Sequence, residues 1–215
     1  MKYIILIASI AVASLGMSSC SEAVADSDYC KSYAVIVMQN NDGNFADALK
    51  SIDTIKIGKD SLMVLYQKAN ALFGTGESEA SFKLLKMLNE KYPRQINVNY
   101  LLAYHYLTLE KPDSALYHSN IAFDLKLNNK ASKPTAEHYN CEIVAGDIFM
   151  EEIRFIRGTA YYRLQNYLEA KNDWLFCLEK KYKPAHVWSA LAGAYEGLGQ
   201  KDSAAYYQEV VDMFY

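Results

Sequence analysis

The sequence predicts an all-α fold, a superhelix of about five stacked helical hairpins. Of the 215 residues, 51% are apolar and 22% are charged, which is the balance of a folded globular chain. Only 10 Gly and 4 Pro occur, too few for the many turns of an all-β fold. A pattern of small and aromatic residues also recurs every 34 residues. Such a period is typical of helix-turn-helix units that stack to bury their apolar faces.

The net charge of the chain argues against nucleic acid as a partner. Lys and Arg number 22 and Asp and Glu number 25, so the formal net charge is −3. A chain with this balance offers no cationic surface to neutralise phosphates. We therefore expect no nucleic-acid partner.

Residues 1–19 predict a secretory signal peptide. One positive charge, Lys2, precedes an apolar run from Tyr3 to Met17 that is too short to span a bilayer comfortably. The next segment, Met17-Ser18-Ser19-Cys20, resembles the lipobox of bacterial lipoproteins. The resemblance implies that Cys20 is acylated and becomes the mature N-terminus, with residues 20–28 as a tether.

The same resemblance implies a membrane anchor in a bacterial cell envelope. Ser21 stands after the Cys where an inner-membrane retention signal would have Asp. We therefore expect an outer-membrane lipoprotein that faces the periplasm or the surface. An alternative stays open, because Ala23-Val24-Ala25 also fits ordinary signal peptidase, which would cleave after Ala25.

Five copies of one residue pattern follow. In the three clear copies a small residue is followed three positions later by an aromatic residue and twelve positions later by Ala. The clear copies are Ala103, Tyr106, Ala115; Gly158, Tyr161, Ala170; and Ala192, Tyr195, Ala204. Weaker copies are Ala69, Leu72, Ser81 and Ile36, Gln39, Ala48. The pattern resembles the tetratricopeptide repeat (TPR), which implies a right-handed α-superhelix.

We place TPR-like units 1–3 at 29–61, 62–95 and 96–129, and units 4 and 5 at 151–184 and 185–215. The small residue of each unit lets its two helices approach closely, and apolar residues of the second helix complete the packing. These second-helix residues are Ile52, Ile55, Leu85, Leu88, Ala122, Trp174, Cys177 and Val211.

Residues 130–150 interrupt the period and predict an inserted loop and helix. Residues 130–134 are a polar loop, and Thr135 is a residue that can cap a helix. Apolar residues then recur near helical spacing up to Ile153. We expect one long helix that runs from Thr135 into the fourth unit, as a lid over the concave surface or as an extension of one hairpin.

None of the common motifs of enzymatic chemistry occurs in the sequence: there is no phosphate-binding loop, no nucleophile elbow and no paired metal-ligand motif. Glu151 and Glu152 are adjacent on a helix and point in different directions, so we interpret them as a solvated acidic patch. We predict no enzyme, no cofactor and no metal. Cys177 is a core residue, whereas Cys30 and Cys141 either form a disulfide or stay free.

The resemblance to TPR proteins places the first helix of each unit on the concave surface. One face of these helices carries aromatic residues, which give contact area at low entropy cost. We therefore predict a tyrosine-rich, partner-binding groove. An alternative stays open, in which the aromatic rings pack against the inserted helix or neighbouring units. The predicted groove residues are Tyr33, Tyr66, Asn70, Phe73, Tyr100, Tyr104, Leu107, Phe155 and Tyr162.

These features predict a non-catalytic, lipid-anchored scaffold or adaptor that binds an envelope protein or peptide through the groove. The alternative is a ligand-binding envelope lipoprotein whose tyrosines stack on sugar rings or hold a peptide. The last helix predicts a homodimer or partner contact, although its Gln208 and Asp212 indicate exposure to water. The apolar and aromatic residues behind this prediction are Tyr206, Tyr207, Met213, Phe214 and Tyr215.

Overall fold

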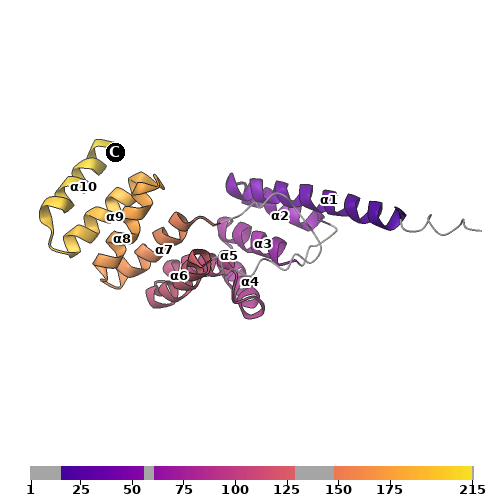
Figure 1. Ribbon diagram of the computed structural model, residues 1–215, viewed down its shortest axis with the longest axis horizontal. Helices are drawn as coiled ribbons and strands as arrows, with labels where there is room; N and C mark the ends of the chain where they lie inside the picture. The colour runs from indigo at the N-terminus through magenta and orange to yellow at the C-terminus, as the bar shows by residue number, and fades with distance from the viewer. Residues whose placement is uncertain (1–15, 56–60, 129–147, 215) are drawn as a thin grey trace, which may run out of the picture.

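The computed structural model describes residues 16–55, 61–128 and 148–214, with side chains from residue 28 onward. In these ranges the chain forms ten α-helices and no strand, which confirms the predicted all-α fold. The helices pair into five antiparallel hairpins (Figure 1). The pairs are α1 (Gly16–Asn41) with α2 (Phe45–Thr54), α3 (Leu62–Gly74) with α4 (Ser78–Lys91), α5 (Ile96–Thr108) with α6 (Pro112–Leu127), α7 (Met150–Arg163) with α8 (Tyr167–Glu179), and α9 (Pro184–Gly197) with α10 (Lys201–Phe214).

The hairpins stack in chain order into a curved array. Each first helix contacts the first helix of the next hairpin, in the pairs α1 with α3, α3 with α5, α5 with α7 and α7 with α9. Among the described residues, no two second helices contact each other. The first helices therefore line the inner face of the array. Figure 1 shows α1 extending beyond the array at one end and the C-terminus at the other.

The turn inside each hairpin has the same backbone conformation. A residue with positive φ stands there in every unit, namely Gly43, Gly76, Glu110, Gln165 and Gly199. The next backbone N–H donates to the carbonyl five residues earlier, over 2.8–2.9 Å in all five turns. This hydrogen bond closes the helix C-terminus in a Schellman motif.

The small residues of the repeat lie where two helices approach closely. Ala69, Ala103, Gly158 and Ala192 are all buried. A Cβ added at Gly158 would lie only 2.8 Å from the Trp174 Nε1 atom, so the α7 and α8 backbones need this glycine. The second-helix residues predicted to pack are buried as well, except Val211, which is half-buried.

The start of α7 differs from the prediction. Phe149 has extended backbone (φ −78°, ψ 157°), and α7 begins at Met150. The expected helix from Thr135 therefore does not run unbroken into the fourth unit. The break is stabilised by the Glu152 carboxylate, which accepts a 2.7 Å hydrogen bond from the Phe149 backbone N–H. Most of the insertion lies outside the described residues.

Most of the predicted signal peptide also lies outside the described residues. Helix α1 begins at Gly16, so Cys20 falls within it. In the described part of the chain, no helix combines the length and the apolar character needed to cross a membrane.

Candidate functional site: the inner face of the array

Three of the predicted groove residues are almost fully buried. Tyr33 is 2% exposed, Leu107 6% and Tyr66 7%. The Tyr33 ring stacks on Tyr29, with centroids 6.1 Å apart, and its hydroxyl accepts a 3.4 Å hydrogen bond from the Gln67 side chain. These side chains pack the array and offer little surface to a partner.

Two predicted groove residues are exposed, Tyr104 at 37% and Tyr162 at 38%. The Tyr104 ring meets Phe73 edge to face, with centroids 5.3 Å apart. The Tyr162 ring packs against Tyr167 and Trp174, at 5.5 and 5.6 Å. Neighbouring rings thus hold both tyrosines in place while one side of each stays accessible. The remaining groove residues, Asn70, Phe73, Tyr100 and Phe155, are half-buried.

Beyond Tyr162 the inner face is no longer lined by aromatic side chains and forms a shallow depression. A Cβ added at Gly193 would lie 2.9 Å from the Tyr162 hydroxyl, so that ring end rests on the α9 backbone. A shallow depression of about 350 Å³ follows at the last hairpin. It is lined by Ser189, Ala192, Gly193 and Glu196 of α9 and by Ala204, Ala205 and Gln208 of α10.

Glu152 is a site residue that the sequence interpretation missed. The solvated position predicted for it is wrong, because its side chain is half-buried on the first turn of α7. Burial raises the pKa of the Glu152 carboxyl, and the charge of Glu151 adds to the shift. The Phe149 amide and the charges of Lys183 and Lys126 oppose it. The position of Glu152 one turn before Phe155 was the available clue, since residues i and i+3 share a helix face.

Aromatic side chains surround this carboxylate. The Tyr182 and Phe155 rings meet at 5.9 Å, and the Lys183 ammonium lies 5.3 Å from the first centroid and 5.7 Å from the second. Tyr100 packs in one apolar cluster with Phe155. Burial raises the pKa of the Tyr100 and Tyr182 hydroxyls, and the negative charge of Glu152 raises it further. We call Glu152, Tyr100, Phe155, Tyr182 and Lys183 the Glu152 cluster.

Several solved structures share this fold. MamA AMB-1 superposes with a TM-score of 0.60 at 17% identity, covering 86% of this chain and 97% of that one. A putative kinesin light chain of Podosopora anserina with nearly identical TPR-like repeats superposes with a TM-score of 0.57 at 14% identity, covering 87% and 95%. The chain has a TPR-like repeat fold. No protein-family model matches the sequence, and no curated protein does.

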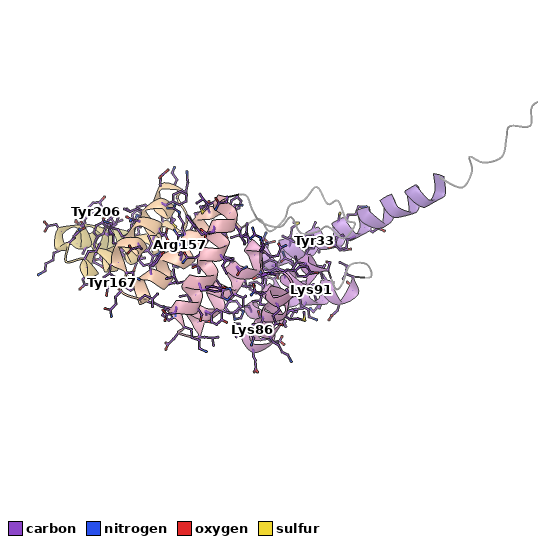
Figure 2. The ribbon with its side chains drawn as sticks, turned by 60° about the horizontal axis from the view of Figure 1, so that its bottom comes forward. Tyr33, Lys86, Lys91, Arg157, Tyr167 and Tyr206 are labelled. Atoms are coloured by element: carbon purple, nitrogen blue, oxygen red, sulfur yellow. The ribbon has the colours of Figure 1, made fainter. Side chains whose placement is uncertain are left out.

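The TPR-like array holds a charged cluster that is structural. Asp173 of α8 is buried, and its two carboxylate oxygens accept 2.7 Å hydrogen bonds from Nε and Nη2 of Arg157 on α7. The Arg157 guanidinium lies 3.6 Å from the Phe123 centroid, and that of Arg154 lies 4.1 Å from Phe176. Figure 2 shows Arg157 in the middle of the array. This cluster fastens α6, α7 and α8 together.

The described residues offer little metal or thiol chemistry. Among them, no group of three or more His, Cys, Asp or Glu side chains could hold a metal ion. The Cys177 thiol is buried, donates to the Glu151 carbonyl over 3.2 Å and has its pKa raised to about 12, chiefly by burial. Cys30 is disulfide-bonded, and Cys141 lies outside the described residues.

Aromatic rings stack in pairs within the last TPR-like hairpin, and one of them, Phe214, is 67% exposed. Tyr207 stacks on Tyr195 at 5.4 Å, and Phe214 stacks on Trp188 at 5.0 Å. Tyr206, at the far end of the array in Figure 2, is 61% exposed, and Met213 is 68% exposed. Gln208 and Asp212 are also exposed, so the outer side of α10 mixes polar and apolar side chains.

Proposed function

We propose that this protein is a non-catalytic scaffold that binds protein partners on the inner face of its TPR-like array. The observation that carries the proposal is the pair Tyr104 and Tyr162. Both rings are held by aromatic neighbours yet remain more than a third exposed, and Tyr162 borders the depression in the last hairpin. Rigid, partly exposed tyrosines are typical of recognition surfaces.

The test is capture of partners from the native envelope with tagged protein and mass spectrometry. The double variant Tyr104→Ala, Tyr162→Ala should lose a partner that the wild type retains. The control is Tyr117→Ala, because Tyr117 is 63% exposed on a second helix, away from the inner face. If all three proteins retain the same partners, the inner face is not the binding surface.

We further propose that Cys20 carries a lipid that anchors the scaffold in the bacterial cell envelope, in the outer membrane. Two acyl chains on the lipobox cysteine would suffice for stable attachment. Metabolic labelling with a clickable fatty acid should mark the wild type and not the Cys20→Ser variant, and the label should fractionate with the outer membrane. A soluble protein whose N-terminus is Asp26 would instead establish cleavage after Ala25.

A homodimer through α10 is a second, separable proposal. It rests on the exposed Tyr206, Met213 and Phe214, since Tyr207 packs on Tyr195 within the last hairpin. Light scattering during size exclusion should report a dimer for the wild type and a monomer for Tyr206→Ser, Met213→Ser. A wild-type monomer at high concentration would end this proposal and leave the scaffold function intact.

A further inference from the structure

The Glu152 cluster has the chemistry of a receptor for a basic side chain. Glu152 and Phe155 lie one turn apart on α7 and therefore share a face of that helix. Tyr182 meets Phe155 edge to face at 5.9 Å, and Tyr100 of α5 packs against the same apolar cluster as Phe155. A carboxylate and three aromatic rings from α5, α7 and the turn before α9 thus lie near the start of α7.

The carboxylate keeps acceptor capacity for a ligand. Its Oε2 atom accepts one hydrogen bond, from the Phe149 amide. The ion pairs within the described ranges of the chain involve other carboxylates. An ionised carboxyl group offers about four lone-pair positions, so most of those of Glu152 remain for a partner's donors.

The aromatic rings already hold one cation. The Lys183 ammonium lies 5.3 Å from the Tyr182 centroid and 5.7 Å from the Phe155 centroid, which is the range of cation–π attraction. Lys183 itself is exposed, so an incoming cation can replace it at the rings. A guanidinium suits such a site better than an ammonium, because it is planar, stacks on aromatic faces and donates two parallel hydrogen bonds to a carboxylate.

We propose that the inner face binds an extended peptide segment of its partner and that an arginine of this segment docks at the Glu152 cluster. The inference rests on the proposed scaffold function and specifies the chemistry of the partner. The arginine guanidinium pairs with the Glu152 carboxylate and stacks on Tyr182 and Phe155. The neighbouring peptide residues then reach the exposed rings of Tyr104 and Tyr162.

A purely structural role for Glu152, as the residue that caps α7, must be separated from this one. Glutamine can accept the same backbone hydrogen bond at that helix position but carries no charge. Glu152→Gln therefore keeps the cap and removes the proposed charge pairing. The matched control is Glu169→Gln, which removes an exposed carboxylate from the first turn of α8, a second helix away from the inner face.

The experiment starts from a phage-displayed library of random decapeptides selected on the folded wild-type protein. We expect the enriched peptides to share an arginine. A synthetic peptide from this set should bind about tenfold more weakly to Glu152→Gln, and about tenfold more weakly to the wild type when its arginine becomes glutamine. The two losses should not add when the variant protein is combined with the variant peptide, and Glu169→Gln should bind like the wild type. Thermal unfolding of Glu152→Gln should match that of the wild type.

Three outcomes would overturn the inference and can be told apart. Enriched peptides without a basic residue, bound equally by Glu152→Gln, would reject the arginine site and leave peptide binding by the scaffold standing. Enrichment of lysine in place of arginine would reject the guanidinium stacking. No enrichment over the Tyr104→Ala, Tyr162→Ala variant would reject peptide binding on the inner face altogether.

Discussion

Glu110 and Gln165 adopt the left-handed conformation that glycines take at the equivalent hairpin turns, with φ of 55° and 62°. A side chain costs about 1 kcal/mol or more in this conformation, whereas glycine costs somewhat less through chain entropy. The turn residue is therefore suboptimal in units 3 and 4. The repeat tolerates this because the hydrogen bond that closes the turn forms in every unit.

We predict that Glu110→Gly and Gln165→Gly each stabilise the protein, by about 0.5 kcal/mol. The double variant should raise the melting temperature by about 2–4 °C in calorimetry. Lys111→Gly, at the next position with φ of −114°, is the control and should destabilise. A lower melting temperature for the double variant would show that other contacts of Glu110 or Gln165 outweigh the backbone term.

His105 replaces an alanine at a contact between units. The corresponding contacts further along the array join Ala115 to Ala160 and Ala170 to Ala194 in shared apolar clusters. Here the Ser81 hydroxyl donates to the Ala69 carbonyl over 2.7 Å, so it accepts from His105 Nε2 over 2.8 Å. Burial lowers the pKa of His105 from 6.5 to about 4, so the ring is neutral in the folded protein at neutral pH.

We predict that acid destabilises the protein through His105. Between pH 6.5 and about 4 the unfolded chain binds a proton at this residue that the folded chain does not. Stability should therefore fall as the pH drops through this window, by at most about 1.4 kcal/mol per pH unit. Urea unfolding at several pH values should show a smaller slope for His105→Gln than for the wild type. His186→Gln, at an exposed histidine, is the control, and an unchanged slope for His105→Gln would contradict the prediction.

At the scale of the element, the α7–α8 hairpin differs from the others in carrying a buried ion pair. Arg157 and Arg154 occupy the face of α7 that packs on α6 and α8, where Asp173 is their only described carboxylate partner. Arg157 and Asp173 side chains are 13% and 4% exposed. Removing one member of such a pair leaves an uncompensated buried charge, whereas replacing both can be nearly neutral.

We predict that Asp173→Ala destabilises the protein by about 3 kcal/mol. The double variant Arg157→Met, Asp173→Leu should recover most of that loss, because it substitutes apolar packing for the pair. Denaturant unfolding of the single and double variants measures both effects. Equal losses in the two variants would mean that the pair itself stabilises the hairpin.

At the scale of the whole molecule, Cys30 of α1 is disulfide-bonded. Cys177 is free and buried. Cys20 lies ten residues from Cys30 on the same helix, a rise of about 15 Å, which exceeds the reach of a disulfide. We therefore expect Cys141, outside the described residues, to be the partner.

Mass spectrometry of a non-reduced digest should find the Cys30 peptide linked to the Cys141 peptide. Iodoacetamide should leave Cys177 unmodified in the native protein and modify it after unfolding, since its thiol is buried with a raised pKa. Reduction should lower the stability of the wild type and not that of Cys30→Ser, because a long closed loop restricts the unfolded chain. A linked Cys177 peptide would contradict the assignment.

The sequence by itself determined the hairpins of this protein. The spacing of Gly158, Tyr161 and Ala170, repeated 34 residues later at Ala192, Tyr195 and Ala204, reflects contacts within one unit and between neighbouring units. Such contacts are local in the chain, so their residue types recur along it. The buried small residues and the repeated turns follow from the same spacing.

Only the tertiary structure decided which residues of the inner face are accessible. Tyr66, Tyr100 and Phe155 hold the same position in their units, yet Tyr66 is buried and the other two are half-buried. Glu152 was assigned to solvent from its neighbours in sequence, whereas Tyr100 and Tyr182 approach it from other helices and loops. The exposed fraction of a side chain and the pKa of a carboxyl group depend on which other side chains pack around them. The curvature of the array and the packing of its helices bring those side chains together. The repeat period carries no information about that convergence.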